Sequence, residues 1–190
     1  GINAPKKLFF QFIAIAIIIK SGFIFSLSAN IYFNIAITVG LYVLIINSMN
    51  LIDGIDGLST SIFILFSLSV IILSFYLLAL DPKYYILIVI FLGSIISFLF
   101  LNFHPAKIFL GDTGSQLIGW ILAVSIVYFS SFFEHNYQKI YLLSFLSLPL
   151  YDVIFVMIKR FYTGNGNLIK KLAGVVYPDK NHIHHLLLKY

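Results

Sequence analysis

The chain has little charge and no cysteine. Only 10% of its residues are charged, while 61% are hydrophobic; a soluble domain carries about 25% charged residues. Together with a mean hydropathy of +1.02, this composition excludes an ordinary soluble domain and indicates an integral membrane protein. The absence of cysteine excludes disulfide bonds and thiolate metal sites.

Six apolar segments come close to the length of about 17–25 residues that a membrane-spanning helix needs. They are residues 8–29, 31–46, 58–80, 84–101, 116–133 and 140–158. Strands of a membrane barrel alternate in polarity over about 9–11 residues, and runs such as 13–19 do not alternate. The sequence therefore predicts an all-α fold, a polytopic membrane helical bundle with about six transmembrane helices. Residues 1–190 would form a single membrane domain, with a basic tail at 159–190.

The basic residues gather on one side of this predicted bundle. If six helices alternate in direction, one side holds the connections 1–7, 47–57, 102–115 and 159–190, which contain most of the lysines and arginines. By the positive-inside rule this side is cytoplasmic. It also holds three short polar stretches, here called the first (47–57), second (110–115) and third (179–185) polar stretch.

The first polar stretch has a carboxylate or amide side chain at every third position: Asn47, Asn50, Asp53 and Asp56. Each such step turns about 60° backwards on an α-helix, so one straight helix cannot direct all four at one point. We expect the helix to end near Asn50, and Gly54 and Gly57 to permit a turn or 3₁₀ segment that gathers both aspartates. Two close carboxylates can bind Mg²⁺ or divide base and orienting roles. The alternative is a capped loop that uses these residues for turn chemistry.

The second polar stretch is predicted to open the next helix. The free N–H groups and positive dipole end of a helix start attract anions. Asp112 could hold Mg²⁺ while these donors bind phosphate oxygens, as in phosphoryl transfer. The alternative is an ordinary N-cap made by Thr113 or Ser115.

The third polar stretch contains three histidines, His182, His184 and His185. We expect them to donate to a phosphate or sugar, helped by Lys180 and Asn181. Zinc is less favoured, although imidazole is a common zinc ligand, because the remaining candidate ligands are hard carboxylates. An inert, hydrated helix end is a further alternative.

Two other polar residues need an explanation. Asp152 lies within the last predicted span, where a charge is costly unless it is paired or faces a cavity. It either orients basic residues of the tail or is a protonated structural aspartate. Lys7 stands one turn before Gln11 at the start of the first span, where it either binds a lipid phosphate or follows the positive-inside rule.

In this order, the motifs resemble those of the polyprenyl-phosphate N-acetylhexosamine-1-phosphate transferases. The matching segments are Pro5–Gln11 (PKKLFFQ), Asn47–Leu58 (NSMNLIDGIDGL), Phe109–Ser115 (FLGDTGS), Leu148–Asp152 (LPLYD) and Asp179–Leu186 (DKNHIHHL). The resemblance implies transfer of an N-acetylhexosamine 1-phosphate from a UDP-sugar to undecaprenyl phosphate, with release of UMP. The histidine motif favours UDP-N-acetylglucosamine as donor. The product would start a cell-envelope polysaccharide such as the O-antigen of lipopolysaccharide or teichoic acid.

The resemblance also implies roles for individual residues. The implied catalytic residues are Asp53, Asp56, Asp112 and His184, with Asp112 as ligand of Mg²⁺, or of Mn²⁺ in its place. The implied substrate-binding residues are Lys7, Asn47, Asn50, His182 and His185. The protein is expected in the bacterial inner membrane with its active site facing the cytoplasm. Membrane lipid is an expected partner, a homodimer is possible, and nucleic acid is not expected.

One departure concerns the start of the chain. The family carries an adjacent aspartate pair just before the segment that matches Pro5–Gln11, and this chain begins after that point. We therefore expect this chain to be the C-terminal part of a longer transferase, and to be weakly active or inactive by itself. The alternatives are an inactive or non-catalytic membrane protein that binds UDP-sugar, and a cation transporter. A transporter would need ionisable residues deep in several spans.

Overall fold

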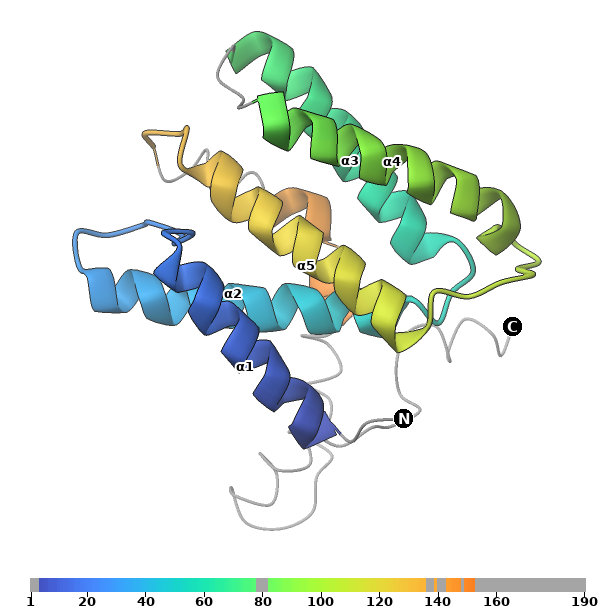
Figure 1. The fold of residues 1–190 in the computed structure, drawn as a ribbon, viewed down its shortest axis with the longest axis horizontal. Coiled ribbons are helices and arrows are strands. Elements are labelled where there is room, and N and C mark those ends of the chain that lie inside the picture. Colours follow the sequence, from blue (N-terminus) through green and yellow to red (C-terminus); the bar gives the residue numbers. More distant parts are fainter. Residues whose placement is uncertain (1–3, 78–81, 136–138, 140–142, 148, 153–190) are drawn as a thin grey trace.

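The described part of the chain is helical. The computed structural model describes residues 4–77, 82–135, 139, 143–147 and 149–152 (Figure 1). These contain the helices α1 (Ala4–Lys20), α2 (Ile31–Ile52), α3 (Leu58–Leu77), α4 (Pro82–Asn102) and α5 (Gly111–Ser130), and the 3₁₀ helix η1 (Ser144–Leu146). No strand occurs in these ranges. The prediction of an all-α fold is confirmed.

Three described helices are long and apolar enough to cross a membrane, namely Ile31–Ile52, Tyr84–Asn102 and Gly111–Ser130. They correspond to three of the predicted spans, in agreement with a membrane helical bundle. Helix α1 has 17 residues. Helix α3 contains a shorter apolar helical segment, Leu58–Ile72. Of the last predicted span, 140–158, the structure describes only parts.

Some predicted helix bounds were wrong. The first helix occupies Ala4–Lys20 instead of 8–29, and the chain then leaves the helix before Asn30 caps α2. The Asn30 Oδ1 accepts hydrogen bonds from the amides of Tyr32 at 2.9 Å and Phe33 at 3.2 Å. Helix α2 continues past the apolar run to Ile52. Hydropathy missed this extension because the polar residues in the last turns of α2 face other helices.

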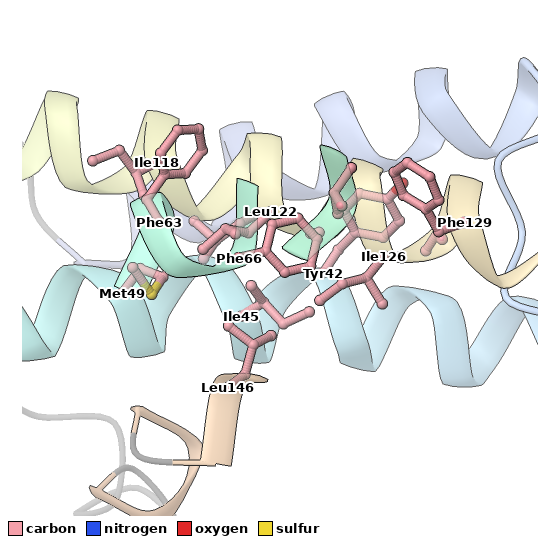
Figure 2. Packing of buried hydrophobic residues seen from close by; sticks show 14 of the residues in the cluster. Tyr42, Ile45, Met49, Phe63, Phe66, Ile118, Leu122, Ile126, Phe129 and Leu146 are labelled. Carbon is pink, nitrogen blue, oxygen red and sulfur yellow. The ribbon is translucent and has the colours of Figure 1, made fainter. Parts of the chain in front are cut away.

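Helices α2 and α5 pack along each other and form the centre of the bundle (Figure 1). Their approach depends on Gly119, because a Cβ atom at this position would lie 2.7 Å from the Cα of Ile46. Close contact through small residues is a general way to pack helices in lipid. The buried side chains around this contact come from α2, α3, α5 and η1, and include Tyr42, Ile45, Met49, Phe63, Phe66, Ile118, Leu122, Ile126, Phe129 and Leu146 (Figure 2).

One end of the bundle collects the side chains of the first two polar stretches. We call it the polar end, formed by the start of α1, the end of α2, the turn 53–57, the segment 103–110 and the start of α5.

Away from the polar end, Lys139 Nζ donates to the carbonyl of Ser26 at 2.8 Å. That contact joins the connection between α1 and α2 to the segment after α5. Among the described residues, those of the connections 1–7, 47–57 and 102–115 meet at the polar end, as predicted.

Candidate active site

The first polar stretch ends α2 and reverses the chain. Helix α2 ends at Ile52, two residues later than expected, and Asp53 is its C-cap. The predicted turn follows, and Gly57 has a positive φ of 70°, which glycine adopts without the strain of a side chain. Helix α3 then begins at Leu58. This turn places Asp53 and Asp56 below the end of α2.

Asp53 faces the start of α3 and is electrostatically linked to α5. Its Oδ1 accepts a hydrogen bond of 2.5 Å from the Ser59 hydroxyl. Burial raises the pKa of Asp53, the Ser59 hydroxyl lowers it in part, and the negative charge of Asp112 raises it further. The first and second polar stretches meet, because Ser115 of the second stretch is hydrogen-bonded to Asn50 of the first.

Helix α5 begins at Gly111, as predicted, and Gly111 has a φ of 64°. Its N-cap residue, Leu110, makes no side-chain capping bond. The alternative that Thr113 or Ser115 caps this helix is therefore wrong, because both residues lie inside it. Ser115 instead donates to the Asn50 Oδ1 at 2.7 Å. This partly buried contact joins α5 to α2.

Helix α1 meets α5 through two successive polar contacts. The Lys7 ammonium forms an ion pair with the carboxylate of Asp112. One helical turn further along both helices, Gln11 Nε2 donates to Gln116 Oε1 at 3.1 Å. Gln11 also accepts a hydrogen bond of 3.1 Å from Asn47 Nδ2. Amide groups of α1, α2 and α5 thus form a layer behind the Lys7–Asp112 pair.

Asp56 has different partners from Asp53. Its Oδ2 accepts a hydrogen bond of 3.0 Å from the Ala106 amide and lies 3.0 Å from His104 Nδ1. These two groups lower the pKa of Asp56, with the Ala106 amide as the larger cause. The turn therefore does gather both aspartates at the polar end, but directs their carboxylates to different elements.

Asn102, at the end of α4, joins the turn 53–57 to the segment 103–110. Its buried side chain accepts hydrogen bonds of 3.2 Å from the Gly57 amide and the Thr60 hydroxyl, and donates to the Ile108 carbonyl at 2.9 Å. Sequence reasoning missed Asn102, His104 and Gln116. The available signal for the first two was the polar sequence Asn102-Phe-His-Pro105 directly after an apolar run.

The hydrogen bond between Asp56 and the segment 103–110 should depend on pH. A lowered carboxyl pKa means that the contact is present above the ordinary carboxyl pKa and is lost as pH falls through the lowered value. We expect the Ala106 amide to be protected from hydrogen exchange at neutral pH. Its protection factor should fall about fivefold at a pH below the lowered pKa of Asp56, and by the same factor in Asp56→Ala. The control is the Lys107 amide, which donates to the Leu101 carbonyl at 2.8 Å and should keep its protection. Unchanged protection at Ala106 in the variant would contradict the assignment.

Other predicted residues lie apart from this cluster or outside the described residues. Asp152 is 2% exposed, so it is buried in the bundle. The third polar stretch, with Lys180, Asn181, His182, His184 and His185, lies outside the described residues. In the part of the chain that is described, no group of three or more histidine or acidic side chains is placed to hold a metal ion.

The chain is similar to known proteins. The glycosyl transferase family 4 model matches residues 1–130. A probable undecaprenyl-phosphate N-acetylglucosaminyl 1-phosphate transferase of Bacillus subtilis is 34% identical over 77% of this chain and 38% of its own length. A decaprenyl-phosphate N-acetylglucosaminephosphotransferase of Mycobacterium tuberculosis is 31% identical over 82% of this chain and 41% of its own length.

A phospho-N-acetylmuramoyl-pentapeptide-transferase of Kosmotoga olearia is 30% identical over 84% of this chain and 50% of its own length. The chain thus spans about two fifths to one half of the curated relatives it matches, at 38%, 41% and 50%. No solved structure matches the chain.

Proposed function

Because the chain belongs to glycosyl transferase family 4, we propose that it carries the active site of an enzyme that transfers N-acetylglucosamine 1-phosphate from UDP-N-acetylglucosamine to undecaprenyl phosphate. The names of the Bacillus subtilis and Mycobacterium tuberculosis relatives support the sugar phosphate and the polyprenyl acceptor. The observation that carries the proposal is the ion pair of Lys7 with Asp112 next to the Asn50–Ser115 hydrogen bond, which brings the first two polar stretches together at the polar end. The lipid product would start a cell-envelope polysaccharide.

The polar end would face the cytoplasm of a bacterial inner membrane. It carries Lys6, Lys7 and Lys107, and basic residues are enriched in cytoplasmic connections. A nucleotide sugar is made in the cytoplasm and is anionic, so basic residues there favour its approach. The acceptor phosphate lies at the bilayer surface while its isoprenoid tail stays in lipid. Both substrates can therefore meet at this end of the helices.

In the reaction, an oxygen of the acceptor phosphate attacks the β-phosphorus of the UDP-sugar. The bond from this phosphorus to the oxygen it shares with UMP breaks, and UMP leaves with that electron pair. The new P–O bond completes a pyrophosphate bridge between the lipid and N-acetylglucosamine. Positioning and charge neutralisation provide most of the catalysis in such phosphoryl transfers.

The residues at the polar end fit a Mg²⁺ ion. Asp112 and Asp53 supply the hard oxygen ligands that this ion prefers. Burial is the main cause that raises the pKa of Asp53, and the charge of Asp112 raises it further, so a bound cation would favour the ionised carboxylate. When bound, Mg²⁺ or Mn²⁺ would neutralise phosphate charge. Asp112 would be the main ligand because it is the more exposed of the two carboxylates.

The remaining residues would bind and orient the substrates. Lys7 would bind a phosphate. The Asn50 Oδ1 is held by Ser115, so Asn50 would donate from its Nδ2, while Asn47 supports α1 through Gln11. Asp56 would position the segment 103–110. His182, His184 and His185 would bind the donor, with His184 acting in catalysis.

The proposal is tested with the full-length protein in membranes, radiolabelled UDP-N-acetylglucosamine and undecaprenyl phosphate. We expect lipid-linked label and UMP in equal amounts, and neither without the acceptor. UDP-N-acetylgalactosamine and UDP-N-acetylmuramoyl-pentapeptide, the second suggested by the Kosmotoga olearia relative, serve as competing donors. Binding of UDP-sugar without any turnover would favour a non-catalytic protein and would overturn the proposal.

The acidic residues argue against a cation transporter. Those that the structure describes at helix ends or in connections are Asp53, Asp56, Asp112 and Glu134, and Asp152 is the buried one. A transport path needs ionisable side chains along several spans. The described spans do not provide such a path.

A further inference from the structure

We propose that Lys7 is a built-in counter-ion of Asp112 that a divalent cation must displace, and that it thereby sets the cation affinity of the site. This inference rests on the proposed function, because it takes Asp112 as a cation ligand. It concerns the competition between the ammonium of Lys7 and the cation for one carboxylate.

The position of Lys7 is fixed by the structure behind it. Gln11, one turn further along α1, is only 4% exposed and is hydrogen-bonded to Gln116 of α5 and Asn47 of α2. Residues one turn apart lie on the same face of a helix. With Gln11 beside Gln116, Lys7 is therefore placed beside Asp112. The ion pair is a consequence of how α1 docks on α5.

The charges at the polar end make this ion pair important. In the described part of the chain, Asp112 pairs with Lys7 and Asp56 with His104, while the hydrogen bond to the Asp53 side chain comes from the neutral Ser59 hydroxyl. The Lys7 ammonium is thus the cationic group that pairs with Asp112 in the described residues. A cation that binds Asp112 would meet this positive charge at contact distance.

Two effects of opposite sign follow. A cation can bind the Asp112 carboxylate only when the Lys7 ammonium moves away, so the lysine weakens cation binding. The released ammonium is then free to bind a substrate phosphate, so the same lysine strengthens binding of the donor. A lysine that only stabilised the fold would not produce this pair of opposite effects.

The test measures Mn²⁺ binding to the full-length protein in detergent by electron paramagnetic resonance, without nucleotide. Because a half-exposed ion pair contributes modestly, we expect Lys7→Met to bind Mn²⁺ about three- to tenfold more tightly than the native protein, while its KM for UDP-N-acetylglucosamine rises. Lys7→Arg, which keeps the charge, should bind Mn²⁺ like the native protein. The matched control is Lys6→Met, an exposed lysine one residue away, which should change Mn²⁺ affinity less than twofold.

The outcomes separate this inference from the proposed function. If Asp112→Asn loses Mn²⁺ binding but Lys7→Met binds no more tightly than the native protein, the competition is refuted while the function stands. If Lys6→Met tightens binding as much as Lys7→Met, the effect is general surface charge and the inference also fails. If Asp112→Asn binds Mn²⁺ like the native protein, Asp112 is not a ligand and both proposals lose their basis. If Lys7→Met does not fold, Lys7→Gln with the same titration decides the question.

Discussion

Replacement of Asp112 by asparagine is expected to lower the turnover number of the transfer reaction by about a hundredfold or more, the usual loss when a group that stabilises transition-state charge is removed. Asparagine has nearly the same size, but it lacks the negative charge that would hold Mg²⁺ and that now pairs with Lys7. The fold should survive, because helix α5 starts from Leu110 without a side-chain cap and does not depend on Asp112 for its first turn. The measurement is lipid-linked product formation against Mg²⁺ concentration.

Glu134→Gln provides the control for this experiment. It removes one carboxylate in the same way, but from an exposed residue just beyond the far end of α5. Its turnover and Mg²⁺ dependence should match those of the native protein. If Asp112→Asn keeps the native Mg²⁺ dependence and a third of the native rate, then Asp112 does not hold the catalytic cation.

The helices and the polar end could be predicted from the sequence because lipid imposes a simple rule. Backbone groups in the bilayer must be satisfied within each segment, so apolar runs become helices and charged residues collect at their ends. The spacing of Asn47, Asn50, Asp53 and Asp56 correctly indicated a turn after α2. The helix ended two residues later than expected because Asn47 and Asn50 make their hydrogen bonds with α1 and α5, which keeps the last turn of α2 helical.

The pairings within the polar end could not be predicted in the same way. Asp56 was grouped with Asp53 on the basis of spacing, but it contacts His104 and Ala106. The partners of Asp56 lie about fifty positions away in the chain, at separations of 48 and 50 residues. Such contacts depend on how α3 and α4 pack, and packing leaves no local pattern in a chain whose helices are apolar on all sides.

The second large effect concerns the contact between α2 and α5. Gly119→Ala adds a Cβ atom 2.7 Å from the Cα and 3.2 Å from the carbonyl oxygen of Ile46. These are backbone atoms, which cannot rotate away, so the helices must separate. Overpacking of this kind costs about 1–3 kcal/mol, while alanine gains at most about 1 kcal/mol over glycine in helix propensity. The net result should be a lower midpoint of thermal unfolding, followed by circular dichroism in detergent.

Gly40→Ala makes the same change on α2, where nothing lies within 4 Å of the added atom. Only the gain in helix propensity remains there, so this variant should be as stable as the native protein or more stable.

The transfer rate should also differ between Gly119→Ala and Gly40→Ala. A shift between α2 and α5 would stretch the Asn50–Ser115 hydrogen bond of 2.7 Å and move Asp53 relative to Asp112, so Gly119→Ala should lose activity at temperatures where it is still folded, and Gly40→Ala should not. Equal stability and equal rates in both variants would mean that the approach of these two helices does not hold the site together.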